Sequence, residues 1–421
     1  MDVVMEEKLI TSAVLVGMAE NAAAVPAHQS SLDELERLLE TAGGVAFAKV
    51  LQIKSTFDAR TCIGSGKVAE IKALCESNGI DLVIFDFELT AGQIRNLEAD
   101  MGGDIRVIDR SMLILDIFAL HATSGEGKLQ VELAQLKYTA PRLMGQGKEL
   151  SRQGGGIGSR GPGESKLESD RRHLKERIRA LEAQLAEMEH TRSVMRRQRD
   201  KSGLKKIAIV GYTNAGKSTL LNALTDAGVL SENKLFATLD PTTRRLELPS
   251  GESVLLTDTV GFIRRLPHHL VEAFRSTLDE VRYADVLMVV ADVADPELAE
   301  QMAVTDEIIK SLDAKDKPRI VVYNKCDSVE GLLCADVRED AVAISAKNGL
   351  GIDLLLAKIE DLLHRQSSEC ELLFPYDAQS RLNELYRDYG VLSTEYVAEG
   401  TRVRARLDQK GKGIFAKYIV Q

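Results

Sequence analysis

The segment GYTNAGKS, residues 211–218, combines two glycines with a lysine and a serine at the spacing of a phosphate-binding loop. It follows the apolar run 207–210 and precedes STLLNALTD, which is typical of a helix. Glycines let backbone N–H groups turn inward around a β-phosphate, and the helix N-terminus adds partial positive charge. We expect Lys217 to reach the β- and γ-phosphate oxygens and the Ser218 hydroxyl to bind Mg²⁺.

Two further segments contain candidates for the phosphate end of the site. Asp258 opens the segment DTVG and is expected to hold a water bound to Mg²⁺, while the amide of Gly261 would sense the γ-phosphate. In LFATLDPTTRR, Thr238 is the expected Mg²⁺ ligand and Thr242 is the second candidate. The metal-binding candidates are Ser218, Thr238 and Asp258, the last through water.

The segment NKCD, residues 324–327, indicates which base is bound. The Asp327 carboxylate can accept hydrogen bonds from the ring N–H and the amino group of guanine, whereas adenine offers no such edge. Asn324 is expected to tie loops together, Lys325 to lie along the base and ribose, and the SAK segment at 345–347 to place amides on the guanine carbonyl oxygen. The nucleotide-binding candidates are Gly211, Tyr212, Thr213, Asn214, Ala215, Gly216, Lys217, Ser218, Thr219, Phe236, Ala237, Thr238, Leu239, Asp240, Asp258, Thr259, Val260, Gly261, Asn324, Lys325, Cys326, Asp327, Ser345, Ala346 and Lys347.

The residue after DTVG is Phe262, where many GTPases of this type have a glutamine that orients the attacking water. A phenylalanine cannot hydrogen-bond to water. We therefore expect slow unaided GTP hydrolysis that a partner accelerates. The catalytic candidates are Lys217, Thr238, Gly261 and Phe262.

The elements needed to position these loops can be read along the chain of 421 residues. Strands and helices alternate in residues 1–138, which predicts a small N-terminal α/β domain. Residues 139–203 are predicted to form a Gly-rich loop and a helical arm. Near-continuous Val- and Ile-rich runs in 204–366 predict a P-loop GTPase domain, with a mostly parallel sheet covered by helices on both faces. Residues 367–421 are predicted to form a small C-terminal α/β domain.

Composition narrows the protein class. The net charge of −10 argues against attraction of the whole molecule to nucleic acid, so such binding would need a local basic patch. The five scattered cysteines are expected to be reduced thiols, with no disulfide framework or zinc site. The acidic start is unlike a signal peptide, and no apolar run reaches the roughly 18–20 residues of a membrane span. We expect a cytoplasmic protein.

The segment RQGGGIGSRGPGESK, residues 152–166, is too rich in glycine to predict a helix. It could be a flexible linker or a segment whose amides and basic side chains approach phosphates. An apolar stripe from Leu174 to Met195 predicts a helix, paired in an αα-hairpin with residues 131–143 rather than in a dimer zipper. The RNA-contact candidates are Arg152, Gly154, Gly155, Gly156, Arg160 and Lys166.

With these motifs, the chain resembles HflX, of the Obg–HflX group of GTPases, from about residue 40 to residue 365. Small departures from the family pattern are Thr243 in DPTTRR, where DPTLRR is expected, and Lys166 in GESKLE, where GETQLE is usual. The segments specific to the family are RTCIGSGKVAEI (60–71), VIDRSMLILDIFALHATSGEGKLQVELAQLKYTAPRLMG (107–145), RQGGGIGSRGPGESKLE (152–168), LFATLDPTTRR and DTVGFIRRLPHHLVEAFRSTLDEV (258–281).

The resemblance implies a monomeric cytoplasmic protein, partly associated with ribosomes, that uses GTP and Mg²⁺. It implies binding to the large ribosomal subunit and splitting of stalled or idle ribosomes under stress, with the N-terminal domain and its arm on ribosomal RNA. Two alternatives stay open at this point. One is a regulatory GTP switch that binds a protein partner, and the other is an RNA-remodelling protein with ATP use in its N-terminal domain.

Overall fold

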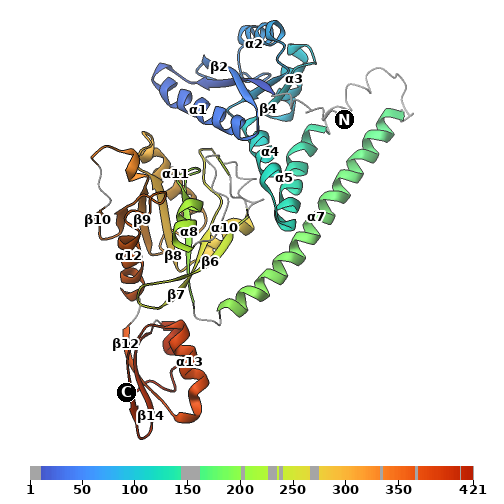
Figure 1. Cartoon of the computed structure of the whole chain (residues 1–421). Helices are drawn as coiled ribbons and strands as arrows, with labels where there is room; N and C mark the ends of the chain where they lie inside the picture. The colour runs from blue at the N-terminus through green and yellow to red at the C-terminus, as the bar shows by residue number, and fades with distance from the viewer. Residues whose placement is uncertain are drawn as a thin grey trace, which may run out of the picture. The chain divides into compact units, whose positions relative to one another are not determined.

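A computed structural model describes residues 11–143, 162–200, 204–225, 235–236, 240–265, 275–331, 335–365, 368–407 and 409–420 (Figure 1). Its chain contacts divide it into two compact units, with the first boundary after Glu187. No helix within these ranges is long and apolar enough to cross a membrane.

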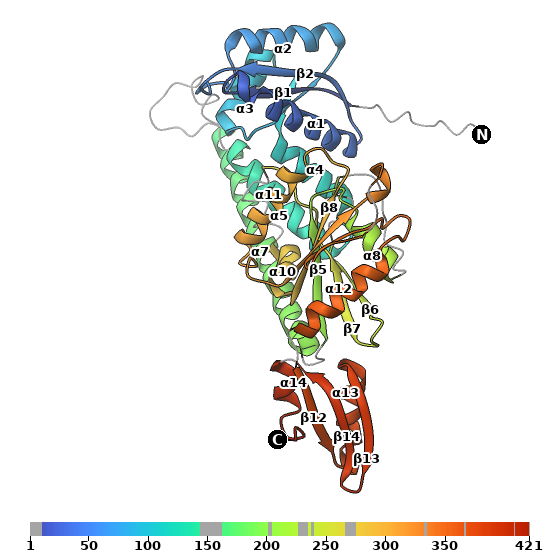
Figure 2. The same ribbon diagram turned by 90° about the vertical axis from the view of Figure 1, so that its left-hand side faces the viewer.

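The first unit is built around a four-stranded parallel sheet in the order β2-β1-β3-β4. Helices α2 and α3 share a buried core with one face of the sheet, and α1 and α4 pack on the other (Figures 1 and 2). The strands are β1 (Ser12–Ala19), β2 (Val45–Ile53), β3 (Leu82–Phe85) and β4 (Arg106–Asp109). The helices are η1 (Ala22–Ala24), α1 (Val25–Thr41), α2 (Ser65–Asn78), α3 (Ala91–Met101) and α4 (Arg110–His121). The N-terminal α/β fold is thus confirmed, and α1 begins at Val25 because Pro26 supports a helical first turn.

A buried ionic cluster joins three elements of this unit. Arg110, the first residue of α4, places its guanidinium between Glu34 of α1 and Asp86 just after β3. The Arg110 Nη1 atom lies 2.8 Å from Asp86 Oδ1, and the Arg110 side chain is 3% exposed. Burial alone would lower the pKa of Arg110, but the two carboxylates outweigh it and raise that pKa. The cluster fixes α1 and α4 on the same face of the sheet.

The helical arm is an αα-hairpin of α5 (Gly125–Leu143) and α7 (Pro162–Asp200), which lie side by side in Figure 1. Two ion pairs join the helices: Arg177 Nη2 lies 2.7 Å from Glu132 Oε1, and Lys137 Nζ lies 2.8 Å from Glu182 Oε1. The hairpin is as the apolar stripe predicted. The expectation that residues 152–166 contain no helix is wrong for the last five of them. Helix α7 begins at Pro162, and proline is well suited to a first helical turn.

The second unit contains a seven-stranded sheet in the order β10-β11-β9-β8-β5-β7-β6, with β6 and β10 antiparallel at the edges. Buried residues of α8 and α12 form one core with the sheet, while α10 and α11 contact its other face (Figure 2). The strands are β5 (Lys205–Gly211), β6 (Thr242–Glu247), β7 (Ser253–Asp258), β8 (Val286–Asp292), β9 (Arg319–Asn324), β10 (Asp336–Arg338) and β11 (Ala341–Ala343). The helices are α8 (Lys217–Thr225), α10 (Arg275–Tyr283), α11 (Leu298–Ser311), η3 (Cys326–Ser328) and α12 (Ile352–Arg365). This is the predicted mostly parallel sheet with helices on both faces.

The chain ends in a small antiparallel sheet in the order β12-β14-β13. Its core joins Leu372, Leu385, Val403 and Phe415. The elements are β12 (Ser368–Phe374), η4 (Tyr376–Ala378), α13 (Gln379–Asp388), β13 (Val391–Val397), β14 (Gly400–Leu407) and α14 (Gln409–Ile414). The fold class is therefore α/β throughout. The boundaries of the four predicted domains stay a proposal.

Candidate nucleotide-binding site

The predicted phosphate loop lies between β5 and α8, where its glycines are required by both backbone and space. Gly211 has φ +146° and Gly216 has φ +92°, conformations that residues with a side chain rarely adopt. A Cβ atom on Gly211 would lie 2.1 Å from the Val290 carbonyl oxygen, and one on Gly216 would lie 2.3 Å from Asn324 Nδ2. The loop can therefore pass closely over the carboxyl ends of the neighbouring strands only with glycine at both positions.

Lys217 opens α8 and is only 6% exposed. Its ammonium donates a hydrogen bond to the Tyr212 carbonyl oxygen, at 2.7 Å. Burial lowers the pKa of Lys217 from 10.5 to about 8, the Asp258 carboxylate opposes this shift, and the Lys325 ammonium adds to it. A buried ammonium in this setting would be stabilised by an anion, such as a phosphate oxygen.

Ser218 and Asp258 bring a hydroxyl oxygen and a carboxylate oxygen together at this end of the site. The Ser218 hydroxyl donates to Asp258 Oδ2 at 2.6 Å, and Asp258, the last residue of β7, is fully buried. Hydroxyl and carboxylate oxygens are the ligands that Mg²⁺ prefers. The residues present thus fit a Mg²⁺ ion.

The residue after DTVG is part of the protein core. Phe262 is fully buried, its N–H donates to the Gly211 carbonyl at 3.0 Å, and its carbonyl accepts from the Thr213 N–H at 2.8 Å. These two hydrogen bonds hold the segment after DTVG against the phosphate loop. The side chain of Phe262 offers no hydrogen bond and points into the core, so it cannot orient a water molecule.

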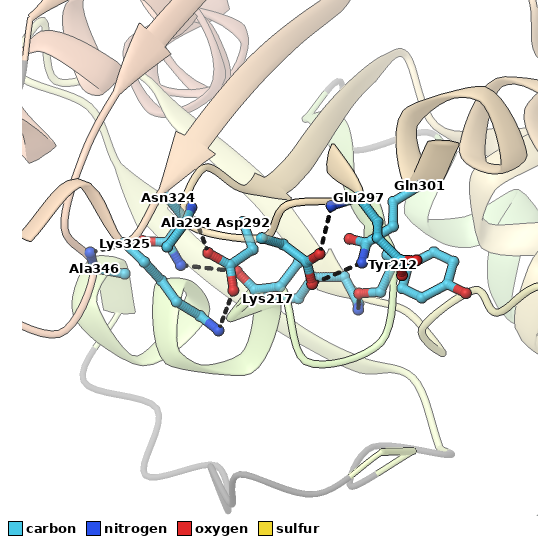
Figure 3. A network of polar contacts seen from close by, with 11 residues as sticks. Tyr212, Lys217, Asp292, Ala294, Glu297, Gln301, Asn324, Lys325 and Ala346 are labelled. Carbon is cyan, nitrogen blue, oxygen red and sulfur yellow. Dashed lines mark hydrogen bonds and ion pairs between the residues drawn. The ribbon is translucent and has the colours of Figure 1, made fainter. Parts of the chain in front are cut away.

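Asn324, the last residue of β9, connects the two loops that flank the expected base site. Its Nδ2 donates to the Ala215 carbonyl at 2.9 Å. Its Oδ1 accepts from the Ala346 N–H at 2.9 Å (Figure 3). The first contact reaches the phosphate loop and the second reaches the SAK segment. Asn324 therefore ties these loops together, as its position in NKCD predicted.

Lys325 has a partner that the sequence motifs did not indicate. Its Nζ lies 2.6 Å from Asp292 Oδ2, while Asp292 Oδ1 accepts from the Ala294 N–H at 3.0 Å (Figure 3). Lys325 itself adopts a left-handed backbone, with φ +66°. Asp292 is the last residue of β8, which neighbours β9, the strand that leads into NKCD. Its place at the end of a strand, at the same sheet edge as NKCD, is the signal from which its role could be predicted.

The remaining candidates of the base site lie around these residues. Asp327 is exposed in η3, Ser345 is fully buried and Lys347 is exposed, so the Asp327 carboxylate is accessible to a ligand. Cys326 is buried and disulfide-bonded. The expectation that all cysteines are reduced is therefore wrong for Cys326, whereas Cys62, Cys75 and Cys370 are free thiols.

Several predicted residues fall outside the described part of the chain. Ala237, Thr238 and Leu239 do so, although their neighbour Phe236 is described and buried. Thr242, the second candidate for the metal, opens strand β6. Lys166 lies in α7, but its side chain is not among those described. The RNA-contact candidates outside the described residues are Arg152, Gly154, Gly155, Gly156 and Arg160.

A phosphate loop after a central parallel strand, with the DTVG, NKCD and SAK loops at the same sheet edge, defines a P-loop GTPase. Three family models match the chain: "GTP-binding GTPase N-terminal" over 29–119, "GTP-binding GTPase Middle Region" over 121–199 and "50S ribosome-binding GTPase" over 206–325. The chain belongs to the HflX family of GTPases.

Individual relatives cover most of the chain. It is 49% identical over 403 residues to the GTPase HflX of Lacrimispora saccharolytica, which spans 95% of this chain and 93% of the relative. It is 40% identical over 373 residues to the GTPase HflX of Escherichia coli (strain K12), with 87% of each chain covered. Among solved structures, a GTP-binding protein of the archaeon Sulfolobus solfataricus in complex with GDP is 27% identical, with a TM-score of 0.43, and the match covers 85% of this chain and 99% of that one.

Proposed function

We propose that this GTPase binds the large ribosomal subunit and splits stalled or idle ribosomes, with hydrolysis of GTP to GDP allowing its release. The observation that carries this proposal is the match of residues 206–325 to a 50S ribosome-binding GTPase, in a chain whose other regions also match the family. The αα-hairpin arm and the Gly-rich segment 152–166 would contact ribosomal RNA. Contacts to RNA phosphates would make the affinity depend on salt.

At the phosphate end, the amides of the loop 211–218 and the Lys217 ammonium would hold the β- and γ-phosphates. Ser218, with Thr238 and a water held by Asp258, would bind Mg²⁺. When bound with the nucleotide, Mg²⁺ neutralises charge on the phosphate oxygens. The Gly261 amide would contact the γ-phosphate, because DTVG is held against the phosphate loop through Phe262.

At the base end, the exposed Asp327 carboxylate would accept two hydrogen bonds from guanine, and the SAK amides would donate to its carbonyl oxygen. We expect Asp327→Asn to weaken GDP binding by at least tenfold and to improve binding of xanthosine diphosphate, because the asparagine amide donates to the 2-oxo group of xanthine. Titration calorimetry with both nucleotides tests this exchange. Unchanged preference for guanine in the variant would count against the assignment of Asp327.

The buried Phe262 implies slow hydrolysis by the protein alone. We expect the GTPase rate to rise at least tenfold when large ribosomal subunits are added, because a partner would order the loops or supply the missing contact to water. The rate is measured with and without subunits for the wild type and for Lys217→Ala. High turnover of the isolated protein that subunits do not change would contradict this expectation.

Sedimentation of intact ribosomes with the protein tests splitting directly. We expect separated subunits with GTP and with a non-hydrolysable GTP analogue, and protein retained on large subunits with the analogue only. Association without splitting would favour a regulatory GTP switch. Strand separation of RNA that needs ATP and not GTP would favour an RNA-remodelling role for the first unit.

A further inference from the structure

The segment that follows DTVG is fixed to the phosphate loop beyond Phe262 as well. The backbone N–H of Arg264 donates a hydrogen bond to the Tyr212 hydroxyl at 2.9 Å. Tyr212 belongs to the phosphate loop and is only 5% exposed, and its carbonyl accepts from Lys217. Any movement of Arg264 therefore changes a contact of the phosphate loop.

The Arg264 side chain is held by the start of helix α11. Its Nη2 atom lies 3.0 Å from Glu297 Oε2 and 2.7 Å from Glu300 Oε2, and the arginine side chain is 13% exposed. Glu297 immediately precedes α11, and Glu300 lies in its first turn. This end of the helix is itself fixed, because the Asp295 carboxylate accepts from the Glu297 N–H at 2.9 Å and from Gln301 Nε2 at 2.8 Å. Since the guanidinium is largely buried, salt screens its pair with Glu297 less than it screens a surface pair.

These contacts concern hydrolysis because of the residues that the segment contains. From Val260 to Ile263 no side chain carries a polar group, and both Phe262 and Ile263 are fully buried. Arg264 is the first charged residue after Asp258, and two carboxylates compensate its charge. Phosphoryl transfer is accelerated when a polar group orients the attacking water or when an arginine stabilises the developing charge. In the described arrangement, this segment supplies neither group.

We propose that the ion pairs of Arg264 with Glu297 and Glu300 form an autoinhibitory latch. They hold the segment after DTVG in an arrangement that is poor for hydrolysis, and the rate rises when they break and the segment rearranges. This inference rests on the proposed function, in which unaided hydrolysis is slow, and adds the contact that keeps it slow. Glu300 is 65% exposed, so a partner can reach the latch. Phosphates of an RNA partner would repel Glu300 and compete for Arg264.

Two variants open the latch to different degrees. Glu297→Gln combined with Glu300→Gln removes both charges and keeps the size of the side chains. Glu300→Gln alone changes only an exposed residue and leaves one ion pair. Asp306→Asn is the matched control, because Asp306 also lies in α11 and its ion pair, 2.6 Å from Arg319 Nη1, does not involve the segment after DTVG. Melting temperatures show whether each variant is folded.

Single-turnover hydrolysis of GTP by the free protein is measured, together with hydrogen exchange of the Arg264 backbone amide. We expect the double variant to hydrolyse GTP roughly fivefold to thirtyfold faster than the wild type, which corresponds to about 1–2 kcal/mol of barrier height. Its Arg264 amide should exchange faster, while its affinity for GDP should stay close to that of the wild type. Glu300→Gln should be intermediate, and Asp306→Asn should match the wild type.

The latch is refuted if the double variant hydrolyses GTP no faster than the wild type, or if Asp306→Asn accelerates hydrolysis equally. Faster exchange without faster hydrolysis also refutes it, since the segment is then released without effect on the reaction. Glu300→Gln decides the question in the same way if the double variant does not fold. The assay contains no ribosomal subunits, so its result does not depend on the proposed partner. An error in the nucleotide site gives a different result, namely hydrolysis by Lys217→Ala at the wild-type rate.

Discussion

Nucleotide binding should be coupled to proton uptake by Lys217. Burial lowers the pKa of this lysine from 10.5 to about 8, Asp258 opposes the shift and Lys325 adds to it. About half of the molecules would then carry a neutral Lys217 at pH 8, against about a tenth at pH 7. A phosphate oxygen in contact with the ammonium raises the pKa again, so binding of GDP should take up about half a proton at pH 8 and about a tenth at pH 7.

The same shift has a consequence for stability. The lowered pKa corresponds to a cost of roughly 3 kcal/mol for the charged lysine in the folded chain. Between pH 8 and pH 10.5 the unfolded chain binds more protons at this site than the folded chain. The cost is therefore fully present below about pH 8 and fades as the pH rises toward the unfolded value. Bound phosphates offset it, so GDP should stabilise the fold more at pH 7 than at pH 9.

Calorimetric titration with GDP in buffers of low and high ionisation enthalpy measures the proton uptake. The slope of the observed enthalpy against the buffer's ionisation enthalpy gives the number of protons. Lys217→Arg is the matched control, because it keeps the positive charge but does not titrate in this range. For this variant, the side chain at position 217 should add nothing to the proton uptake between pH 7 and pH 8. If the wild type showed no larger rise than the variant, the lowered pKa or the contact of Lys217 with phosphate would be refuted.

Three other substitutions have clear expected outcomes. Gly216→Ala should weaken GDP binding at least tenfold in calorimetry, because the added Cβ would lie 2.3 Å from Asn324 Nδ2. Gly251→Ala is the control, since Gly251 has a similar φ of +85° but no neighbour within 4 Å of the added Cβ. This control should only lower the melting temperature. Equal loss of binding in both would rule out the steric explanation. Arg110→Ala should lower the free energy of unfolding by about 3–5 kcal/mol in urea, because it leaves two buried carboxylates without their cation, and a loss below about 1 kcal/mol would contradict this. Asp292→Asn should weaken GDP binding several-fold with little change in melting temperature, because it removes the negative charge that holds Lys325. Unaltered affinity for GDP would show that the ion pair does not position the lysine.

Much of this protein could be predicted from local patterns. The phosphate loop, DTVG, NKCD and SAK are short segments whose chemistry depends on residue type and spacing, and each follows a strand as expected. Buried parallel strands and the apolar stripe of α7 are also local signals, because they follow the periods of strand and helix. The start of α7 at Pro162 is not evident from composition, because the surrounding glycines disfavour a helix whereas proline is well suited to its first turn.

The sequence by itself therefore determined the class of the protein, its guanine-binding motif and the order of its elements. Only the tertiary structure decided which side chains meet. Asn324 reaches Ala215 across 109 positions of sequence, and Lys325 meets Asp292 because β8 and β9 are neighbours in the sheet. The burial of Phe262 likewise depends on how the segment after DTVG packs on the phosphate loop. Motifs state which groups are present, whereas contacts between distant segments depend on strand order and packing, which no short pattern contains.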